Sequence, residues 1–403
     1  MELFWLEHKK LWRKKIVKIC VLLCFVYCVI FGSILSFQWF CFGSSDDYTS
    51  AFGNNFDGYT VIKDSQEYAL SFGGELTDET LQKIVSDYQQ MEADGMGEEL
   101  EKTDWQIVNS WLGTLYPELR DTSNYKTMIS YVDPDKLTGF YERRQQVLDE
   151  FLEVSGQVGA EKEFLHQIER KVEKPFRYEW VEGWSTLLGS TVADLGVVMA
   201  LFLGIVLSSL FAGEWHDNTS TLVLTTRNGW GKIALAKILT GLAFTVELFA
   251  LLAVSSVISQ LFFMGTAGWN MPIQNIKLIA VAPMNMLQAE IYEYAFVLLG
   301  AIGFAGIVMF ISAAVKNNVL TLLLSLAVVY GPMMIAEYLP YEMQKALDLI
   351  PLVGSSTDIF RTNTFRILGK LIWSPYLLIT IPVLIGILCM PFAIKSWSRR
   401  MKA

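Results

Sequence analysis

The chain has 403 residues, of which 52% are hydrophobic and only 18% are charged, and its formal net charge is −9 at pH 7. This composition excludes an ordinary water-soluble globular protein, because such domains carry about 25% charged residues. The negative net charge also argues against nucleic acid as a partner.

The first 15 residues predict an amphipathic helix. Apolar residues can share one face and basic residues the other: Phe4, Trp5, Leu11 and Trp12, against Lys9, Lys10, Arg13 and Lys14. A helix of this kind suits the plane of the lipid headgroups. Two interpretations stay open here: an elbow helix that also borders a cytoplasmic partner, and a basic flank that only orients the first span.

Six apolar segments are long enough to cross a bilayer, which takes about 20 helical residues. In chain order they are Ile16–Phe42, Leu187–Ala212, Ile233–Met264, Tyr294–Val315, Val319–Ala336 and Ile372–Ile394. Basic residues cluster at both ends of the chain, so the positive-inside bias places both termini in the cytoplasm, as six spans require. The sequence therefore predicts an all-α, multi-pass protein of the cell membrane, in contact with lipid.

Residues 43–185 separate the first two spans and predict an acidic extracellular domain. They hold 29 of the 41 acidic and 13 of the 32 basic residues, a net charge of −16. Thr77 precedes a predicted helix, and residues 55–72 and 125–132 contain runs typical of strands. A second helix is predicted from one apolar stripe: Val147, Phe151, Val154, Val158, Leu165, Ile168 and Val172. The expected fold of this domain is α/β.

Motifs for enzymatic chemistry are absent from the sequence. It contains no G-x-x-x-x-G-K-[ST] phosphate loop, no H-E-x-x-H metal motif and no G-x-S-x-G nucleophile motif. Cys20, Cys24 and Cys28 repeat every four residues on one face of the first span. We interpret them as packing residues and not as a metal site, because no histidine or carboxylate lies nearby. We expect neither a metal nor another cofactor in this chain, and no catalytic residue.

The most informative segment is the polar loop from Gly213 to Lys237. Glu214 ends the second span, Thr219 follows five residues later, an apolar stretch comes next, and Lys237 lies near the start of the third span. With six spans and an entry helix, this pattern resembles the permease subunits of ABC-2 type ABC transporters. Their loop usually has Pro-x-x-Arg before the lysine, where this chain has Arg227 and Trp230.

The resemblance implies a membrane-spanning permease subunit of an ATP-driven exporter. It implies a second permease copy or a homologous permease as partner, and an ABC ATPase subunit, in two copies, that binds ATP and Mg. It also implies a coupling loop at 213–232 and an external re-entrant segment at 337–371. The expected organisation is an entry helix at 1–15, a first span at 16–42, an extracellular domain at 43–185 and the five remaining spans within 186–403. The expected ATPase-coupling residues are Glu214, Asp217, Thr219, Arg227 and Lys237.

Physical reasoning about the loop leaves two interpretations. A short helix over 218–225, capped by Asp217 or Thr219, can enter a cleft of a partner, and Glu214 can pair with Arg227 or Lys232. The alternative is an ordinary capped loop.

Charged residues in the spans are costly unless they are paired or hydrated. Glu247, near the middle of the third span, is a candidate for the translocation path, or else a hydrogen-bonded packing residue. Glu290 and Glu293 are expected in water at the outer end of the fourth span. Two further functions stay open: a membrane-anchored extracellular sensor or interaction protein, and a secondary transporter that uses Glu247.

Overall fold

The computed structural model describes residues 2–30, 66–67, 69, 73–96, 105–121, 123, 126–217, 231–354 and 363–399. This part of the chain is mostly helical and contains two small antiparallel sheets. Five of its helices are long and apolar enough to cross a membrane. The fold is therefore compatible with a multi-pass membrane protein.

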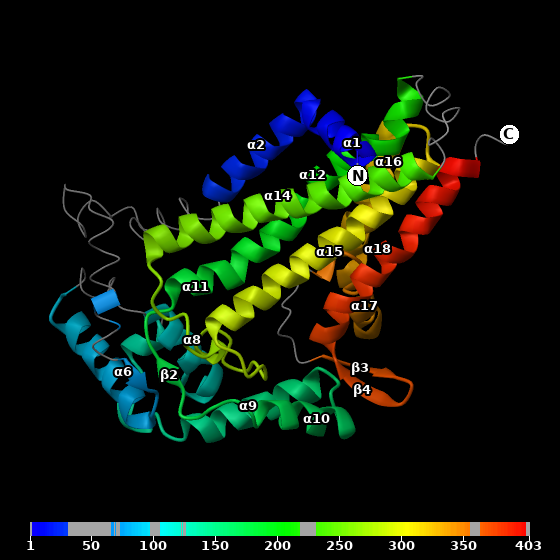
Figure 1. Cartoon of the computed structure of the whole chain (residues 1–403). Helices are drawn as coiled ribbons and strands as arrows, with labels where there is room; N and C mark the ends of the chain where they lie inside the picture. Colours follow the sequence, from blue (N-terminus) through cyan, green and yellow to red (C-terminus); the bar gives the residue numbers. More distant parts are fainter. Residues whose placement is uncertain are drawn as a thin grey trace.

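The five long helices run side by side and match the second to sixth predicted spans (Figure 1). They are α12 Val192–His216, α14 Lys232–Met264, α15 Met286–Ala314, α16 Asn318–Ile335 and α18 Ser374–Arg399. The first predicted span is described as α2 Lys15–Val29, which follows α1 Glu2–Arg13. The 15 residues of α2 are too few to cross a bilayer alone, and residues 31–42 lie outside the described chain.

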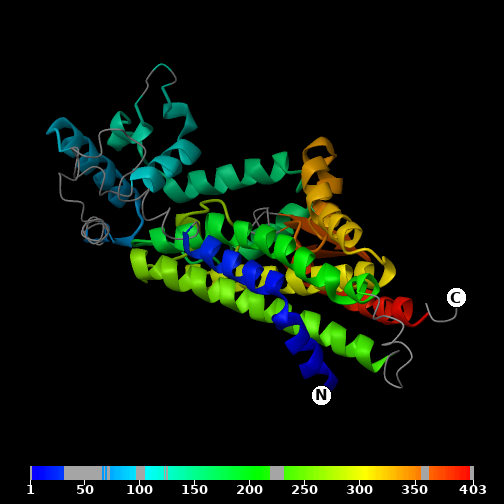
Figure 2. The same cartoon turned by 90° about the horizontal axis from the view of Figure 1, so that it is seen from above.

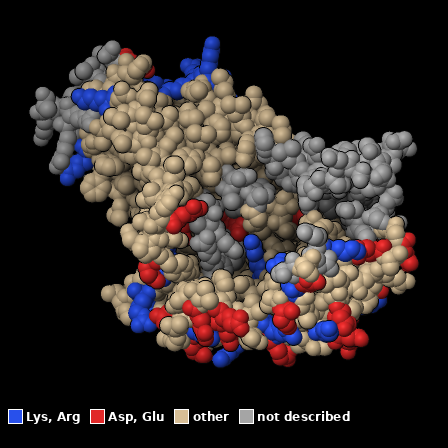
Figure 3. All heavy atoms as spheres, turned by 180° about the vertical axis from the view of Figure 1, so that it is seen from behind, with Lys and Arg blue, Asp and Glu red and all other residues tan. Residues whose placement is uncertain are grey.

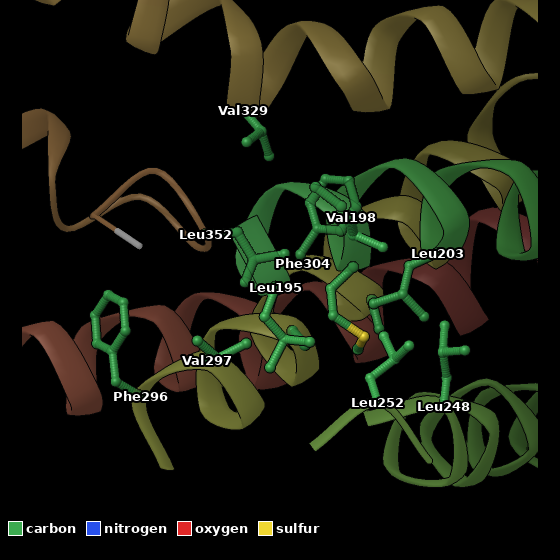
Figure 4. Close-up of a cluster of buried hydrophobic side chains, with 14 of the residues drawn as sticks. Leu195, Val198, Leu203, Leu248, Leu252, Phe296, Val297, Phe304, Val329 and Leu352 are labelled. Atoms are coloured by element: carbon green, nitrogen blue, oxygen red, sulfur yellow. The ribbon is translucent and has the colours of Figure 1, made fainter. Parts of the chain in front are cut away.

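The helices of the bundle meet around α15. Figure 4 shows Leu195 of α12, Leu252 of α14, Phe304 of α15 and Val329 of α16 in one buried apolar cluster. Helix α18 lies against α15 at glycines: a Cβ atom on Gly303 would stand 2.3 Å from the backbone oxygen of Pro382. Small residues let helix backbones approach this closely, and such contacts hold apolar helices together in lipid.

The segment between the first two spans folds into a separate helical unit. Its elements are α6 Asp78–Ala93, α8 Trp105–Leu115, 3₁₀ turns at Pro117–Leu119, Met128–Ser130 and Pro134–Lys136, α9 Phe140–Val154, α10 Ala160–Glu169, and the antiparallel strands β1 Gly74–Glu75 and β2 Arg177–Tyr178. We call it the large domain. Helix α6 confirms a prediction: the Thr77 side chain caps it by accepting a hydrogen bond from the Thr80 backbone N–H at 3.2 Å. A short α11 Glu182–Thr186 and a π-helical turn, Leu187–Thr191, lead into α12.

Two predictions for the large domain are wrong. The described part of 125–132 holds a 3₁₀ turn and no strand, so the domain is helical with one two-residue sheet; residues 55–72 lie almost wholly outside the described chain. The apolar stripe is also broken, because a turn with Gly156 and Gly159 at positive φ separates α9 from α10. Val154 is consequently 89% exposed, and Leu148 and Leu152 are buried instead.

The segment 337–371 contains more than the predicted re-entrant helices. A 3₁₀ turn at Ala336–Tyr338 and helix α17 Tyr341–Leu347 are followed by a hairpin of β3 Thr364–Ile367 and β4 Lys370–Trp373. The hairpin lies beside α10 (Figure 1), and its side chains form hydrogen bonds with the large domain. Thr364 Oγ1 donates to Gln157 Oε1 at 2.7 Å, and Arg366 pairs with Glu161 at 2.5 Å.

Charged side chains are unevenly distributed over the surface. On the face shown in Figure 3, acidic and basic residues cover the large domain at the bottom, and basic residues mark the opposite end. A broad tan region with few charges separates them. A charge-poor belt between two charged ends is what a bilayer-embedded bundle requires.

Candidate functional site

The two ends of the 213–232 loop are joined by a buried ion pair. Glu214 lies in the last turn of α12 and Lys237 in the second turn of α14, on either side of residues 218–230, which are not described. Lys237 Nζ lies 2.8 Å from Glu214 Oε1, and their side chains are only 2% and 4% exposed. Two of the predicted coupling residues therefore meet, and their contact closes the base of the loop.

Helix α1 adds two more charges to this pair. Lys10 Nζ lies 2.6 Å from Glu214 Oε1, and Lys237 Nζ lies 2.7 Å from Glu7 Oε2. We call these four residues the α1 clamp. Lys14 continues the contact, since its Nζ donates to Ser209 Oγ of α12 at 2.9 Å. The sequence predicts the basic face of α1 but not the partners of its charged residues, which lie about two hundred positions away.

The charges of the clamp shift the pKa of the two lysines of α1 in opposite directions. Burial lowers the pKa of Lys10, but its bond to Glu214 and the charges of Glu214, Glu7 and Asp217 outweigh burial, and the pKa rises. The pKa of Lys14 is lowered, by burial first and then by the like charges of Lys237 and Lys10. Lys10 is thus held firmly as a cation beside Glu214.

Glu247 contacts α1 as well. His8 Nε2 lies 3.1 Å from Glu247 Oε1, and Trp12 Nε1 donates to Glu247 Oε2 at 3.0 Å. Helix α14 has 33 residues, so it is about 50 Å long and exceeds a hydrocarbon core of about 30 Å. If Met264 marks one boundary of the core, the other falls near Thr245. Glu247 then lies at that boundary, where it holds α1 by hydrogen bonds.

The remaining predicted residues are separated from the clamp or not described. The Asp217 side chain is 69% exposed and lies 3.2 Å from His216 Nδ1. Thr219, Arg227 and the predicted helix at 218–225 lie outside the described residues. The structure thus brings together Glu214 and Lys237 and leaves Asp217 at the surface beside them.

Helices α15 and α18, and the turn between α15 and α16, meet the end of α12. Ser312 Oγ of α15 donates to the Ser208 carbonyl at 2.7 Å and accepts from the Phe211 and Ala212 backbone N–H groups. Trp215 stacks edge-on with Trp397 of α18, and Lys316 Nζ lies 4.4 Å above its ring. A displacement of the loop base would therefore reach α1, α14, α15 and α18 directly.

Comparison with known proteins gives no relative: no family model, curated protein or solved structure matches this chain. The likeness to ABC-2 permeases consequently rests on the loop residues and on the order of the spans.

Proposed function

We propose that the chain is the membrane-spanning permease subunit of an ATP-driven exporter. Separate ATPase subunits would bind ATP and Mg, dock on the 213–232 loop and drive export through a pathway built by two permease chains. The observation that carries this proposal is the buried Glu214–Lys237 pair at the loop base, tied to α1 by Lys10 and Glu7.

The ion pair would make the base of the loop stiff. A force on a loop with a flexible base deforms the loop itself. When a buried, hydrogen-bonded ion pair closes the base, the same force displaces the two helices that the loop connects. Removing one partner of such a pair costs about 3–5 kcal/mol, because it leaves a buried charge without its partner. Force applied to residues 218–230 would thus move the ends of α12 and α14 together, with α1 attached.

The extracellular sensor has one observation in its favour. A cavity of about 460 Å³ lies between α8, α11 and the loop that joins α14 to α15, and Trp111, Glu182 and Asn275 are among its lining residues. It has the size of a site for a small molecule. Filling it by Thr114→Trp would abolish ligand responses if sensing is the function, and would leave ATPase binding intact if export is the function.

The first test is purification of the full chain in mild detergent, with mass spectrometry of associated proteins. We expect a nucleotide-binding ATPase in stoichiometric amount. In a matched variant, a Gly-Ser linker of equal length replaces residues 218–230, while Glu214 and Lys237 stay in place. This variant should insert in the membrane and lose the ATPase. Full transport activity of the chain without any ATPase would contradict the proposal.

The second test separates binding from coupling. Glu214→Gln keeps the side-chain shape and removes the charge that Lys10 and Lys237 share. We expect the ATPase to remain bound while substrate no longer changes its hydrolysis rate. Glu79→Gln, an acid of the large domain, serves as the control. Unchanged coupling in the Glu214 variant would mean that the loop is only a connector.

A further inference from the structure

Two buried polar side chains lie where α14 ends and α15 begins. Gln260 is fully buried and Glu290 is 4% exposed. Neither amide atom of Gln260 and neither carboxyl oxygen of Glu290 has a hydrogen-bond partner in the part of the chain that is described. Buried polar groups are nearly always hydrogen-bonded, and an unsatisfied one costs about 1–3 kcal/mol. Four unsatisfied atoms on neighbouring helices therefore need an explanation.

The register of the two helices brings these side chains to the same level. Helices α14 and α15 are antiparallel and are joined by residues 265–285 (Figure 1). Ser256 Oγ and Tyr294 OH share a hydrogen bond of 2.8 Å across the interface. Gln260 and Glu290 each lie four residues from this pair, one helical turn closer to the connecting loop. Tyr294 also interacts with the Glu290 carboxyl group.

Among the described residues, no lysine, arginine or histidine forms an ion pair with Glu290, and the groups that act on its carboxyl include no cation. The titratable groups at this cluster are Tyr294 on its own helix and Cys28 of α2, which interacts with Tyr294. The end of α14, from Leu248 to Met264, contains no charged residue, and Ser256 and Gln260 are among its buried positions. An ionised carboxylate at such a place is so costly that the group takes up a proton instead.

A neutral carboxylic acid also fits the amide chemically. The carboxamide of Gln260 offers N–H donors and an oxygen acceptor, and a protonated carboxyl offers one O–H donor and one carbonyl acceptor. The two side chains are not hydrogen-bonded to each other in the structure. A protonated carboxyl group is complementary to both the donor and the acceptor of the amide, whereas an ionised carboxylate can only accept. The protonated form of Glu290 is therefore the one that suits its uncharged, buried neighbours.

We propose that Glu290, with Gln260, Tyr294 and Ser256 beside it, forms a proton-binding site between α14 and α15. Glu290 holds the proton while the helices are packed together and loses it when they part. In that step the carboxyl O–H bond breaks, the electron pair stays on the carboxylate, and the proton passes to water that enters the opened interface. The site does not depend on an ATPase partner.

The large domain holds the loop above this site. Arg144 donates to the backbone carbonyls of Leu278 and Ala280, and Trp111 Nε1 donates to that of Asn275 at 3.0 Å. Movement of the large domain would pull on the connection between α14 and α15. Proton release from Glu290 is thereby linked to the position of the large domain.

In the test, the full chain is placed in lipid nanodiscs and treated with dicyclohexylcarbodiimide. This reagent modifies protonated carboxyl groups in apolar surroundings. Mass spectrometry should find the label on Glu290. Labelling should fall about tenfold for each pH unit above its midpoint, because only the protonated fraction reacts. Glu290→Gln should lose the label. Glu293→Gln, which removes a second buried acid on the same helix, should retain it.

Three results would overturn the proposal. The first is absence of label on Glu290 in the native chain while other carboxyl groups react. The second is labelling of Glu290 that does not change with pH. The third is protection by sodium chloride but not by choline chloride at constant pH, which would identify a metal-cation site. The readout on the native chain stays valid even if the Glu290 variant folds poorly.

Discussion

At the scale of single residues, Arg144 connects the large domain to the bundle. Its side chain is fully buried, and its guanidinium group donates to Glu169 Oε1 at 2.6 Å as well as to the carbonyls of Leu278 and Ala280. Lys174 Nζ lies 2.9 Å from the same Glu169 oxygen. A planar guanidinium group suits three acceptors in fixed directions, which a lysine would not satisfy. This residue thus joins α9, α10 and the α14–α15 loop.

We expect Arg144→Met to destabilise the docking of the large domain by about 3–5 kcal/mol, because two buried carbonyls lose their donor and Glu169 keeps only its contact with Lys174. The measurement is thermal unfolding of the detergent-solubilised chain, followed by limited proteolysis of the large domain. Arg143→Met is the matched control, since Arg143 is more exposed and pairs with exposed Glu118. Its cost should stay below about 1 kcal/mol. Equal effects of the two variants would contradict the role of Arg144.

The same contact predicts a dependence on pH. Burial raises the pKa of Glu169, but hydrogen bonds from Lys174 and Arg144 outweigh burial and leave the pKa below its usual value. A carboxyl group with a lowered pKa stabilises the folded state above its unfolded pKa of about 4.3, and this stability is lost as pH falls through the folded pKa. Unfolding temperature should therefore drop in this acidic range. Glu169→Gln should remove that part of the drop, and an unchanged acid profile would refute the argument.

At the scale of elements, α1 is the least expected component of the site. It lies across α14 (Figure 2), reaches the end of α12 through Lys10, and makes polar contacts on two of its sides. The clamp residues Glu7 and Lys10 hold one side, and His8 and Trp12 bind Glu247 on the other. Trp5 and Leu6 are more than 60% exposed and face away from the protein. This exposed apolar face suits contact with lipid.

We expect Glu247→Ala to loosen α1, because it removes the acceptor that His8 and Trp12 share. The Glu247 side chain is 43% exposed, so water weakens both contacts and the expected loss is about one or two kcal/mol in total. Trypsin should then cut at the basic residues of α1 roughly 5–30 times faster, as a loss of one or two kcal/mol implies. The assay uses inverted membrane vesicles and an antibody against the N-terminus. Glu337→Ala, a polar residue after α16, is the control. Equal cutting rates in native and variant chains would show that Glu247 does not hold α1.

The helices of the bundle and α6 follow from local patterns, since length, apolar content and a capping threonine act within a few residues. The failures have non-local causes. The apolar stripe over α9 and α10 was predicted for one continuous helix. The turn at Gly156 and Gly159 divides that helix in two, so the apolar positions of α9 and α10 no longer lie on one face. Helix α15 begins at Met286, eight residues before the predicted span, because Asn285 and Gln288 form a capping box. Glu290 and Glu293 are consequently buried, where the sequence predicted contact with water.

The candidate site could be predicted only in part for the same reason. Glu214 and Lys237 are close in sequence and belong to a recognisable loop pattern. The partners of these residues in α1, and those of Glu247, are separated from them by more than two hundred positions. No periodicity connects such distant residues. Gln260 and Glu290 likewise appear as isolated polar residues until the antiparallel register of α14 and α15 brings them to one level.

At the scale of the whole molecule, the large domain bridges two parts of the bundle. Arg144 binds the loop between α14 and α15, and Glu161 binds the hairpin that precedes α18. The predicted orientation places all of these contacts outside the cell, and the α1 clamp inside. A ligand on the large domain and a partner at the 213–232 loop would then act on opposite ends of the same helices.

This orientation can be tested with single cysteines and a membrane-impermeant maleimide on intact cells. Val154→Cys of the large domain and Asp217→Cys of the loop are suited to it, because both positions are well exposed. The background replaces Cys41 and the partly exposed Cys389 by serine and keeps the three buried cysteines of α2, whose thiols are shielded. One span, α12, lies between the two positions, so we expect labelling at 154 in intact cells and at 217 only after permeabilisation. Glu2→Cys should behave like 217 if the first segment crosses the membrane, and like 154 if it does not. Labelling of 154 and 217 from the same side would contradict a spanning α12, and with it the proposed separation of the large domain from the coupling loop.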